Sequence, residues 1–320
     1  MITGLSRGNR AVTRAQTRNH QFGGKRYWWA DVSGNGGAGP INYVIPIKAN
    51  GSFSLAQPDG VSCNVLGTNA VDLSLHLAGF PANCASGAGS FAGGATVKAS
   101  GVSSFCFGSS SQATGNYSVC FGLATTALGP SDVGFSSAAV NGSYSFGAGF
   151  HVTVTGASAF GSGNSCNAPL YGQRAHAAGQ FAVVGDSQLS SLVARNSTSN
   201  ETPTNLFLDG SSVRLVVPAN TTWEFEIHII ARTASATGTY AKFVRSGIIS
   251  RNSTVGSTAI ATVDTLGTDR GSNANTPPAG WAVAVTADTT NGALDIQVTG
   301  AAATNIRWVA HVMLAEVAFP

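Results

Sequence analysis

The sequence predicts an all-β protein: a trimeric β-roll, a β-solenoid of 14-residue repeats, followed by a C-terminal antiparallel β-sandwich that is jelly-roll-like. Three observations support this fold class. Gly accounts for 40 of the 320 residues and charged residues for only 10%, against about 7% and 25% in ordinary soluble domains. A glycine-punctuated unit recurs about every 14 residues from Gly87. Beyond residue 185, apolar and polar side chains alternate as they do in half-buried strands.

The N-terminal 50 residues are expected to form a basic arm. The first 30 residues contain six basic and no acidic side chains, although the whole chain has a net charge of only +3. Three interpretations of the arm stay open: docking into an acidic or aromatic-lined socket of another protein, which we favour, a solvated arm, or phosphate binding to nucleic acid. The residues expected to dock are Arg7, Arg10, Arg14, Arg18, Lys25, Arg26, Trp28 and Trp29.

A small β region over residues 51–86, with the run VDLSLHL, is expected to lead into a roll shaft over residues 87–184. The repeats start at Gly87, Gly101, Gly115, Gly129, Gly142, Gly156 and Gly172. Fourteen residues are too few for two helices, but they suffice for two short strands and two tight turns. Four positions after each start we expect a core residue, and these are Phe91, Phe105, Val119, Val133, Phe146 and Phe160.

A coil of two short strands has little interior of its own. We assign Phe107, Phe121 and Phe135 to a second strand face, so that one face fills each roll and the other fills a centre shared by three chains. The sequence therefore predicts a homotrimer. A disordered linker is the alternative, but regularly placed Phe and Gly argue against it.

The five cysteines are odd in number and form no CxxC pair, so neither a disulfide framework nor a zinc site is expected. Cys106 and Cys120 occupy equivalent small positions of the repeat. We interpret them as small buried hydrophobic residues rather than as a disulfide or a reactive thiol.

Residues 185–320 are expected to form the sandwich tip. The run WEFEIHII places Trp223, Phe225, Ile227 and Ile229 on one strand face. Asn291-Gly292 between two alternating runs is a strong hairpin pattern. The last run, NIRWVAHVMLAEVAF, is expected to end the chain in another strand.

Two stretches resemble known families. The half-repeat Gly-x-x-Ser/Ala-φ-Ala-x-Gly is similar to the head repeats of trimeric autotransporter adhesins. The stretch from LYGQRAHAAGQFAVVGDSQLSSLVARNSTSN, with SVRLVVPANTTWEFEI and IRWVAHVMLAEV, resembles a C-terminal module of tailed-bacteriophage tail fibres and tail spikes. The resemblance implies a homotrimeric fibre whose far end meets the host surface. Adhesins of that class carry a signal peptide and a membrane anchor, and neither is recognised here, which favours a virion protein assembled in the host cytoplasm, without membrane insertion.

An enzyme is not expected. Glycoside cleavage needs two carboxylates at about 5 to 10 Å, and Asp132 is the only acid within residues 87–179. Glu224, Glu226 and His228 alternate along one strand, which we interpret as a solvated sheet face rather than an acid/base or metal cluster. The histidines lack metal-site spacing, and no cofactor is expected.

The sequence thus predicts a structural and binding protein, namely a phage tail fibre or receptor-binding protein. Its partners would be two further copies, a virion protein of the tail or capsid, and a host surface glycan or protein. The alternatives are a capsid-attached head fibre or decoration spike, and a glycan depolymerase tailspike with an intersubunit site. Candidate receptor contacts, on an exposed loop, are Asp269, Arg270 and Asn273.

Overall fold

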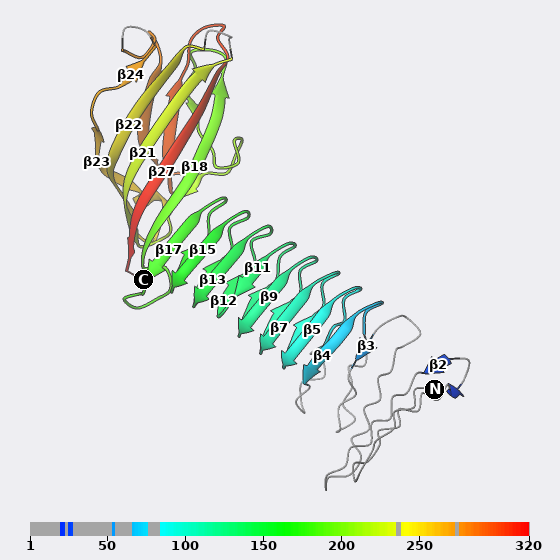
Figure 1. The fold of residues 1–320 in the computed structure, drawn as a ribbon. Coiled ribbons are helices and arrows are strands. Elements are labelled where there is room, and N and C mark those ends of the chain that lie inside the picture. Colours follow the sequence, from blue (N-terminus) through cyan, green and yellow to red (C-terminus); the bar gives the residue numbers. More distant parts are fainter. Residues whose placement is uncertain are drawn as a thin grey trace, which may run out of the picture. The chain divides into compact units, whose positions relative to one another are not determined.

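The computed structural model describes residues 20–22, 25–27, 53–54, 66–75, 84–234, 238–272 and 275–319 (Figure 1). These residues form strands and one short 3-10 helix, Val255–Ser257, and none of their helices could cross a membrane. The chain divides into two compact units, Met1–Ser137 and Ala138–Pro320. Of the expected docking residues, Lys25 and Arg26 lie in strand β2 (Lys25–Tyr27), which pairs with β1 (His20–Phe22). The others, Arg7, Arg10, Arg14, Arg18, Trp28 and Trp29, lie outside the described residues.

The first unit contains a β-roll in which each 14-residue repeat contributes two strands, as predicted. The longer strands form one parallel sheet of β3 (Phe53–Ser54), β4 (Val71–Leu75), β5 (Phe91–Ala95), β7 (Phe105–Ser109), β9 (Val119–Leu123) and β11 (Val133–Phe135). The shorter strands form a second parallel sheet of β6 (Lys98–Ala99), β8 (Gln112–Ala113) and β10 (Thr126–Ala127). Phe91, Phe105, Val119 and Val133 are in register, so equivalent positions of successive repeats stack directly.

Backbone contacts between coils explain the glycines and the buried polar residue of each repeat. A Cβ on Gly101 would overlap the carbonyl oxygen of Gly115 in the next coil, so only Gly allows this approach. Ser104 donates a hydrogen bond from its hydroxyl to the carbonyl of Gly101, at 2.8 Å. Asp132 takes the equivalent place two coils later, and its carboxylate accepts the Gly129 N–H at 2.8 Å. Buried in this role, Asp132 stabilises a turn.

The interior of the roll corrects the predicted repeat core. Within the first unit, the small residues Ala92, Cys106 and Cys120 are completely buried, whereas Phe105 is only half-buried and Phe107 is 42% exposed. Side chains two positions apart on a strand point to the same side, so Phe105 and Phe107 share the outer face of the sheet. Two expectations were therefore wrong: Phe107, Phe121 and Phe135 do not form a second face, and Phe91, Phe105, Val119, Val133, Phe146 and Phe160 do not fill the roll.

A disulfide joins Cys106 to Cys120, whose Cα atoms are 4.7 Å apart. The expectation of two unbonded hydrophobic cysteines was wrong because parallel, in-register stacking brings equivalent positions of adjacent coils to bonding distance. A spacing of 14 residues shows this only when the repeat is known to be one full coil. Cys166 is free and buried.

The second unit begins with further coils of the same kind. Their strands are β12 (Ala138–Val140), β13 (Phe146–Phe150), β14 (Val152–Val154), β15 (Phe160–Asn164), β16 (Asn167–Ala168) and β17 (Arg174–Ala178). Residues 91–178 together make about six solenoid turns. Phe160 pairs with Arg174, so the last repeat begins at Leu170 and not at Gly172, and the apparent 16-residue spacing was a misalignment.

The C-terminal domain is an antiparallel two-sheet structure, as predicted. Its larger sheet consists, in order, of β18 (Ser187–Thr198), β27 (Ile306–Ala318), β21 (Thr221–Thr233), β22 (Tyr240–Arg251) and β23 (Ala259–Thr265), with β24 (Arg270–Gly271) also on β22. The smaller sheet contains β19 (Thr204–Asn205), β20 (Leu215–Val216), β25 (Ala282–Asp288) and β26 (Ala293–Thr299). Because β17 pairs with β18, the longer strands of the coils continue into the larger sheet (Figure 1).

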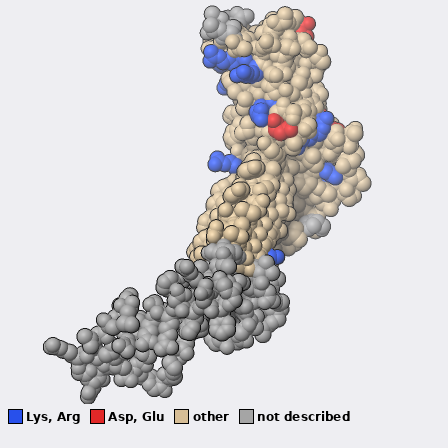
Figure 2. Space-filling view, turned by 90° about the vertical axis from the view of Figure 1, so that its right-hand side faces the viewer, with Lys and Arg blue, Asp and Glu red and all other residues tan. Residues whose placement is uncertain are grey.

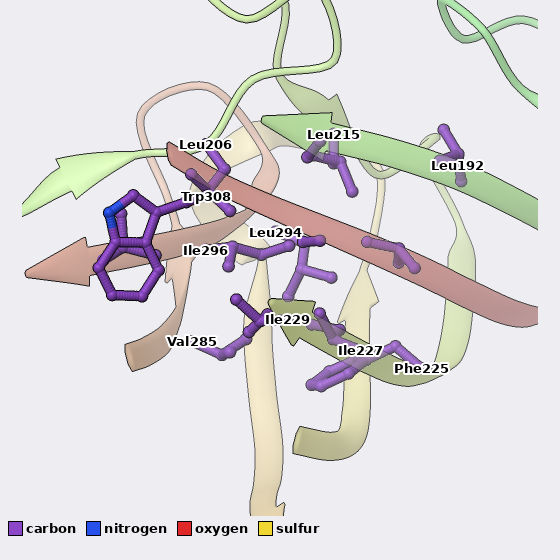
Figure 3. Packing of buried hydrophobic residues seen from close by; sticks show 14 of the residues in the cluster. Leu192, Leu206, Leu215, Phe225, Ile227, Ile229, Val285, Leu294, Ile296 and Trp308 are labelled. Carbon is purple, nitrogen blue, oxygen red and sulfur yellow. The ribbon is translucent and has the colours of Figure 1, made fainter. Parts of the chain in front are cut away.

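A large apolar core lies between these two sheets (Figure 3). The predicted alternation is confirmed, since Trp223, Phe225, Ile227 and Ile229 are all buried. Trp308 joins them from β27, and its indole N–H donates to the hydroxyl of Thr198 at 3.0 Å. The predicted hairpin is also confirmed: β25 and β26 are joined by a turn over 289–292.

Candidate functional site

The most unusual surface of the coils is a row of exposed aromatic side chains on the outer face of the longer strands. In the first unit the rings of Phe91 and Phe105 stack at 4.8 Å between centroids, and those of Phe107 and Phe121 at 5.3 Å. Phe135 lies 6.4 Å from Phe121. In the second unit, Phe146 and Phe160 stack at 5.1 Å. We call these seven residues the aromatic ladder.

The ladder presents apolar area to solvent within a single chain. Phe107, Phe121 and Phe135 are 42%, 46% and 38% exposed, and Phe160 is 38% exposed. Each unit thus has its own exposed apolar strip, and such strips are rare on a monomeric soluble protein and usually mark an interface. The small interior of the coil cannot contain these rings, since a Cβ at Gly147 would already meet the side chain of Val140. Only an additional surface can remove them from water.

In the second unit the same outer face continues onto the larger sheet of the C-terminal domain. Strand pairing places His176 directly opposite Leu189, which is 61% exposed. Val317, on β27, is 49% exposed. A hollow of about 460 Å³ opens here and is lined by His176, Leu189, Val317, Phe181 and others. Next to the coils, β18 and β27 therefore carry exposed apolar side chains on their outer side.

Glu316 is a buried carboxylate beneath this hollow. Its oxygens accept hydrogen bonds from the Trp223 indole at 3.0 Å and from the side-chain amides of Gln188 and Gln173 at 3.3 and 3.5 Å. Burial raises the pKa of Glu316 above its ordinary value, and these hydrogen bonds oppose the rise. The donors come from β21, β18 and the turn before β17, so the network fixes how the last coil meets the larger sheet.

The residues that the sequence offered as a catalytic or metal cluster do not converge. Glu226 and His228 are neighbours on the outer face of β21, with Oε1 and Nε2 2.7 Å apart, and both are well exposed. Glu224 is exposed on the same face. Among the residues that the structure describes, no three His, Cys, Asp or Glu side chains are grouped so that they could hold a metal ion.

A carboxylate pair that sequence reasoning missed lies on the β25–β26 hairpin. Arg214 places one Nη1 atom 3.2 Å from Asp288 Oδ2 and 3.0 Å from Asp295 Oδ1. Burial raises the pKa of Asp295. The pKa of Asp288 is lowered, because hydrogen bonds from Asn291 and Thr290 and the charge of Arg214 outweigh its burial. The two acids are seven positions apart in the sequence, so only the hairpin register reveals the pair.

The predicted receptor contacts have different environments. Asp269 forms a two-pronged ion pair with Arg245, with both N–O distances 2.8 Å, and Arg245 is buried. Asp269 therefore anchors its loop. Arg270, the next residue, is exposed in β24. Asn273 lies outside the described residues.

Comparison with solved structures finds phage tailspikes at low similarity. They include tailspikes of the Acinetobacter phage vB_ApiP_P1 (10% identity, TM-score 0.20, 72% of this chain and 50% of that one) and of Acinetobacter baumannii phage AM24 (8%, 0.18, 70% and 49%). A third is gp49 of Acinetobacter baumannii bacteriophage Fri1 (10%, 0.24, 78% and 44%), described as a capsular polysaccharide depolymerase. The chain thus spans about half the length of these tailspikes. No protein-family model and no curated protein matches it.

The expectation that the chain is not an enzyme is corrected. One of the tailspikes to which the chain is similar is described as a capsular polysaccharide depolymerase. The expectation considered Asp132 on the roll and the exposed Glu224 and Glu226, and it missed Asp288 and Asp295, which folding brings to the same guanidinium.

Proposed function

We propose that the chain is a receptor-binding protein of a bacteriophage tail and acts as a homotrimer. The aromatic ladder carries this proposal, because three chains packed around a common axis would cover the exposed rings with one another. The resemblance of the repeats to trimeric adhesin heads, and of residues 170–320 to phage fibre modules, supports the same arrangement. Avidity would then follow from three equal sites on one rigid body.

In this proposal the parts of the chain have separate tasks. The basic arm over residues 1–50 docks to a virion protein, the coils form a spacer, and the C-terminal domain meets a glycan or protein of the host surface. A capsid-attached fibre or decoration spike would use the same parts and would differ only in where the arm docks. The protein would be part of the virion and would be assembled in the host cytoplasm.

The mass in solution tests the trimer. Light scattering of the full chain, and of residues 51–320, is expected to give three times 32.3 kDa for the former and a trimer for the latter. Phe121→Ser should lower the mass toward that of one chain. Tyr117→Ser is the matched control, because Tyr117 is 63% exposed at a position where the neighbouring coils carry Ser103 and Ser131. A monomeric wild type would contradict the proposal.

Binding of labelled protein to a panel of capsulated and acapsular bacterial strains tests the receptor role. We expect binding to a subset of strains, and weaker binding by Phe121→Ser because avidity is lost. The absence of binding to any strain by a trimeric protein would favour the capsid decoration role.

Polysaccharide cleavage is a second candidate function, favoured by Asp288 and Asp295. Glycoside hydrolysis uses one carboxyl that keeps its proton and one that stays ionised, and the pKa values of these two groups are displaced in those opposite directions. The test is the release of reducing sugars from a capsular polysaccharide. Asp295→Asn should abolish the release and Asp264→Asn, on exposed β23, should leave it unchanged.

A further inference from the structure

The C-terminal domain has a second distinctive surface, on the outer face of its larger sheet at the end away from the coils. Residues 185–320 contain eight basic and ten acidic side chains. Three of the basic residues are engaged internally: Arg214 with Asp288 and Asp295, Arg245 with Asp269, and Arg251 with the carbonyl of Val217 at 2.7 Å. The other five are exposed and lie together, and they are Arg195, Arg232, Lys242, Arg270 and Arg307. We call them the basic patch.

Strand register places the patch residues in two adjacent rows. Arg232 lies directly opposite Arg307, and Lys242 directly opposite Arg270. Like charges directly opposite in an antiparallel pair destabilise a sheet. Among the described residues no ion pair joins any of the five to a carboxylate. In Figure 2, Lys and Arg side chains lie mainly on the C-terminal domain, and the coils are almost uncharged.

Two acidic side chains beside the patch are held by their own loops. Asp269 precedes Arg270 but pairs with Arg245. Asp209 accepts hydrogen bonds from the Ser211 hydroxyl and from backbone N–H groups of Ser211, Ser212 and Val213, which hold its pKa well below the usual range. Its contact with Arg195 is through the backbone carbonyl, at 2.8 Å. The positive charge of the patch therefore stays available to a ligand.

A hollow lies within the patch. It has a volume of about 250 Å³, and its lining includes Arg195, Arg307, Asn196 and Ser197. The Asn196 amide is engaged with the backbone of Asn205 and Ser197. The two guanidinium groups beside the Ser197 hydroxyl suit one anionic sugar unit, because guanidinium binds carboxylate and phosphate with two parallel hydrogen bonds. The hollow is smaller than the roughly 300–1,000 Å³ of sites for drug-sized ligands.

We propose that the basic patch binds an anionic polysaccharide through the carboxylate or phosphate groups of its sugars. One row runs from Arg195 through Val309 and Ile230 to Lys242 and Arg270. It crosses five strands, or about 19 Å at about 4.8 Å per strand, which suits a polymer better than a single ion. Val309 and Ile230, 39% and 51% exposed, offer apolar contact between the charges.

The spacing of charges favours a polysaccharide over nucleic acid. Duplex DNA carries one charge per about 1.7 Å of its axis, whereas the row has three cations over about 19 Å, with two apolar residues between Arg195 and Lys242. The patch also cannot pack against its own copies, because like charges repel. In the trimer it would stay open to solvent while the exposed apolar side chains of β18 and β27, next to the coils, are covered. The inference rests on the proposed receptor role and names the ligand class for it.

The test measures binding of the full chain to polygalacturonate, to polyglycerol phosphate and to neutral dextran. We expect binding to one or both polyanions, whose relative affinity identifies the preferred group, and none to dextran. Raising the salt from about 0.05 M to about 0.5 M should weaken the binding. Arg232→Gln with Arg307→Gln should weaken it about tenfold, and Lys98→Gln, in the coils, is the control for a lost charge.

Equal binding to dextran, equally tight binding to duplex DNA, or an unchanged affinity of the double variant would overturn the inference. The outcome is separable from that of the proposed function. A double variant that stays trimeric and still binds cells like the wild type contradicts the patch alone. A wild type that is monomeric or binds no strain contradicts the proposed function, whatever its affinity for polygalacturonate.

Discussion

The coils and the C-terminal domain bury apolar side chains in opposite ways. The C-terminal domain encloses Trp223, Phe225 and Trp308 between two sheets. The coils enclose Ala, Cys and Val side chains and leave Phe107 and Phe121 on their outer face. The difference arises from thickness: two sheets about 10 Å apart accommodate aromatic rings, whereas a coil of two short strands has room only for small groups.

The two regions therefore obtain their stability from different sources. Fully burying a large apolar side chain contributes about 1.5–3 kcal/mol, and the C-terminal domain gains this within one chain. The coils gain regular backbone hydrogen bonds and ring stacking, but most of the benefit of their phenylalanines depends on a covering surface. The loss in free energy of unfolding should therefore depend on protein concentration for substitutions in the coils, and it should be independent of concentration for substitutions in the C-terminal domain.

The largest effect is expected for Trp308→Ala. The substitution removes a fully buried indole that lies 5.5 Å from the ring of Trp281, and large-to-small changes of this kind lower the free energy of unfolding by about 3–5 kcal/mol. Denaturant titration should show the loss at every protein concentration. Phe121→Ala is the matched substitution in the coils, and in dilute protein it should cost less than about 1 kcal/mol. Equal losses would contradict the contrast.

The second prediction concerns the disulfide of the coils. Cys106→Ala with Cys120→Ala should destabilise the coils by about 3 kcal/mol, the value for a closed loop of about 15 residues. Ala fits both sites, since Ala92 occupies the equivalent position of the preceding coil. Hydrogen exchange should rise in β7 and β9 and stay unchanged in β21. Reductant should likewise raise exchange in β7 and β9 of the wild type.

A smaller loss, about 2 kcal/mol, is expected for Asp269→Asn, because Arg245 is left buried without its carboxylate. The side chain of Asp269 is 27% exposed, so solvent screening reduces the loss from that of a fully buried pair. Thermal unfolding checks the value, and Asp264→Asn is the control on exposed β23. If both variants unfold alike, the ion pair does not anchor the loop.

The smallest effect is the pH dependence due to Glu316. Its pKa is raised in the folded protein, so the protonated form is favoured there and stability falls as pH rises from the unfolded value, about 4.3, through the raised folded value. Relative to Glu316→Gln, the wild type should lose stability over that window. Asp186, whose pKa is lowered by backbone N–H groups despite its burial, should act in the opposite sense. Parallel pH profiles of wild type and Glu316→Gln would contradict the assignment.

Much of the fold could be predicted because local patterns determine it. Gly101 and its equivalents recur because a Cβ would collide with the next coil, and the alternation from Trp223 to Ile229 follows from one buried strand face. The face of Phe107 was misassigned because the strand period of two was not applied to it. Of the basic patch, only Arg270 was identified from the sequence, through its loop. Lys242, Arg232 and Arg307 belong to other strands, and only strand pairing shows that they share its face.

The solenoid, the sandwich and their order along the chain can be predicted from the sequence alone. Close backbone approach and strand periodicity act between residues that are near in sequence or one repeat apart. Four features follow only from the tertiary structure: the side of the coil that carries Phe121, the bond between Cys106 and Cys120, the sharing of Arg214 by Asp288 and Asp295, and the gathering of five cations on one face. These depend on strand register across the sheets, which is set by the packing of the whole domain rather than by any single segment.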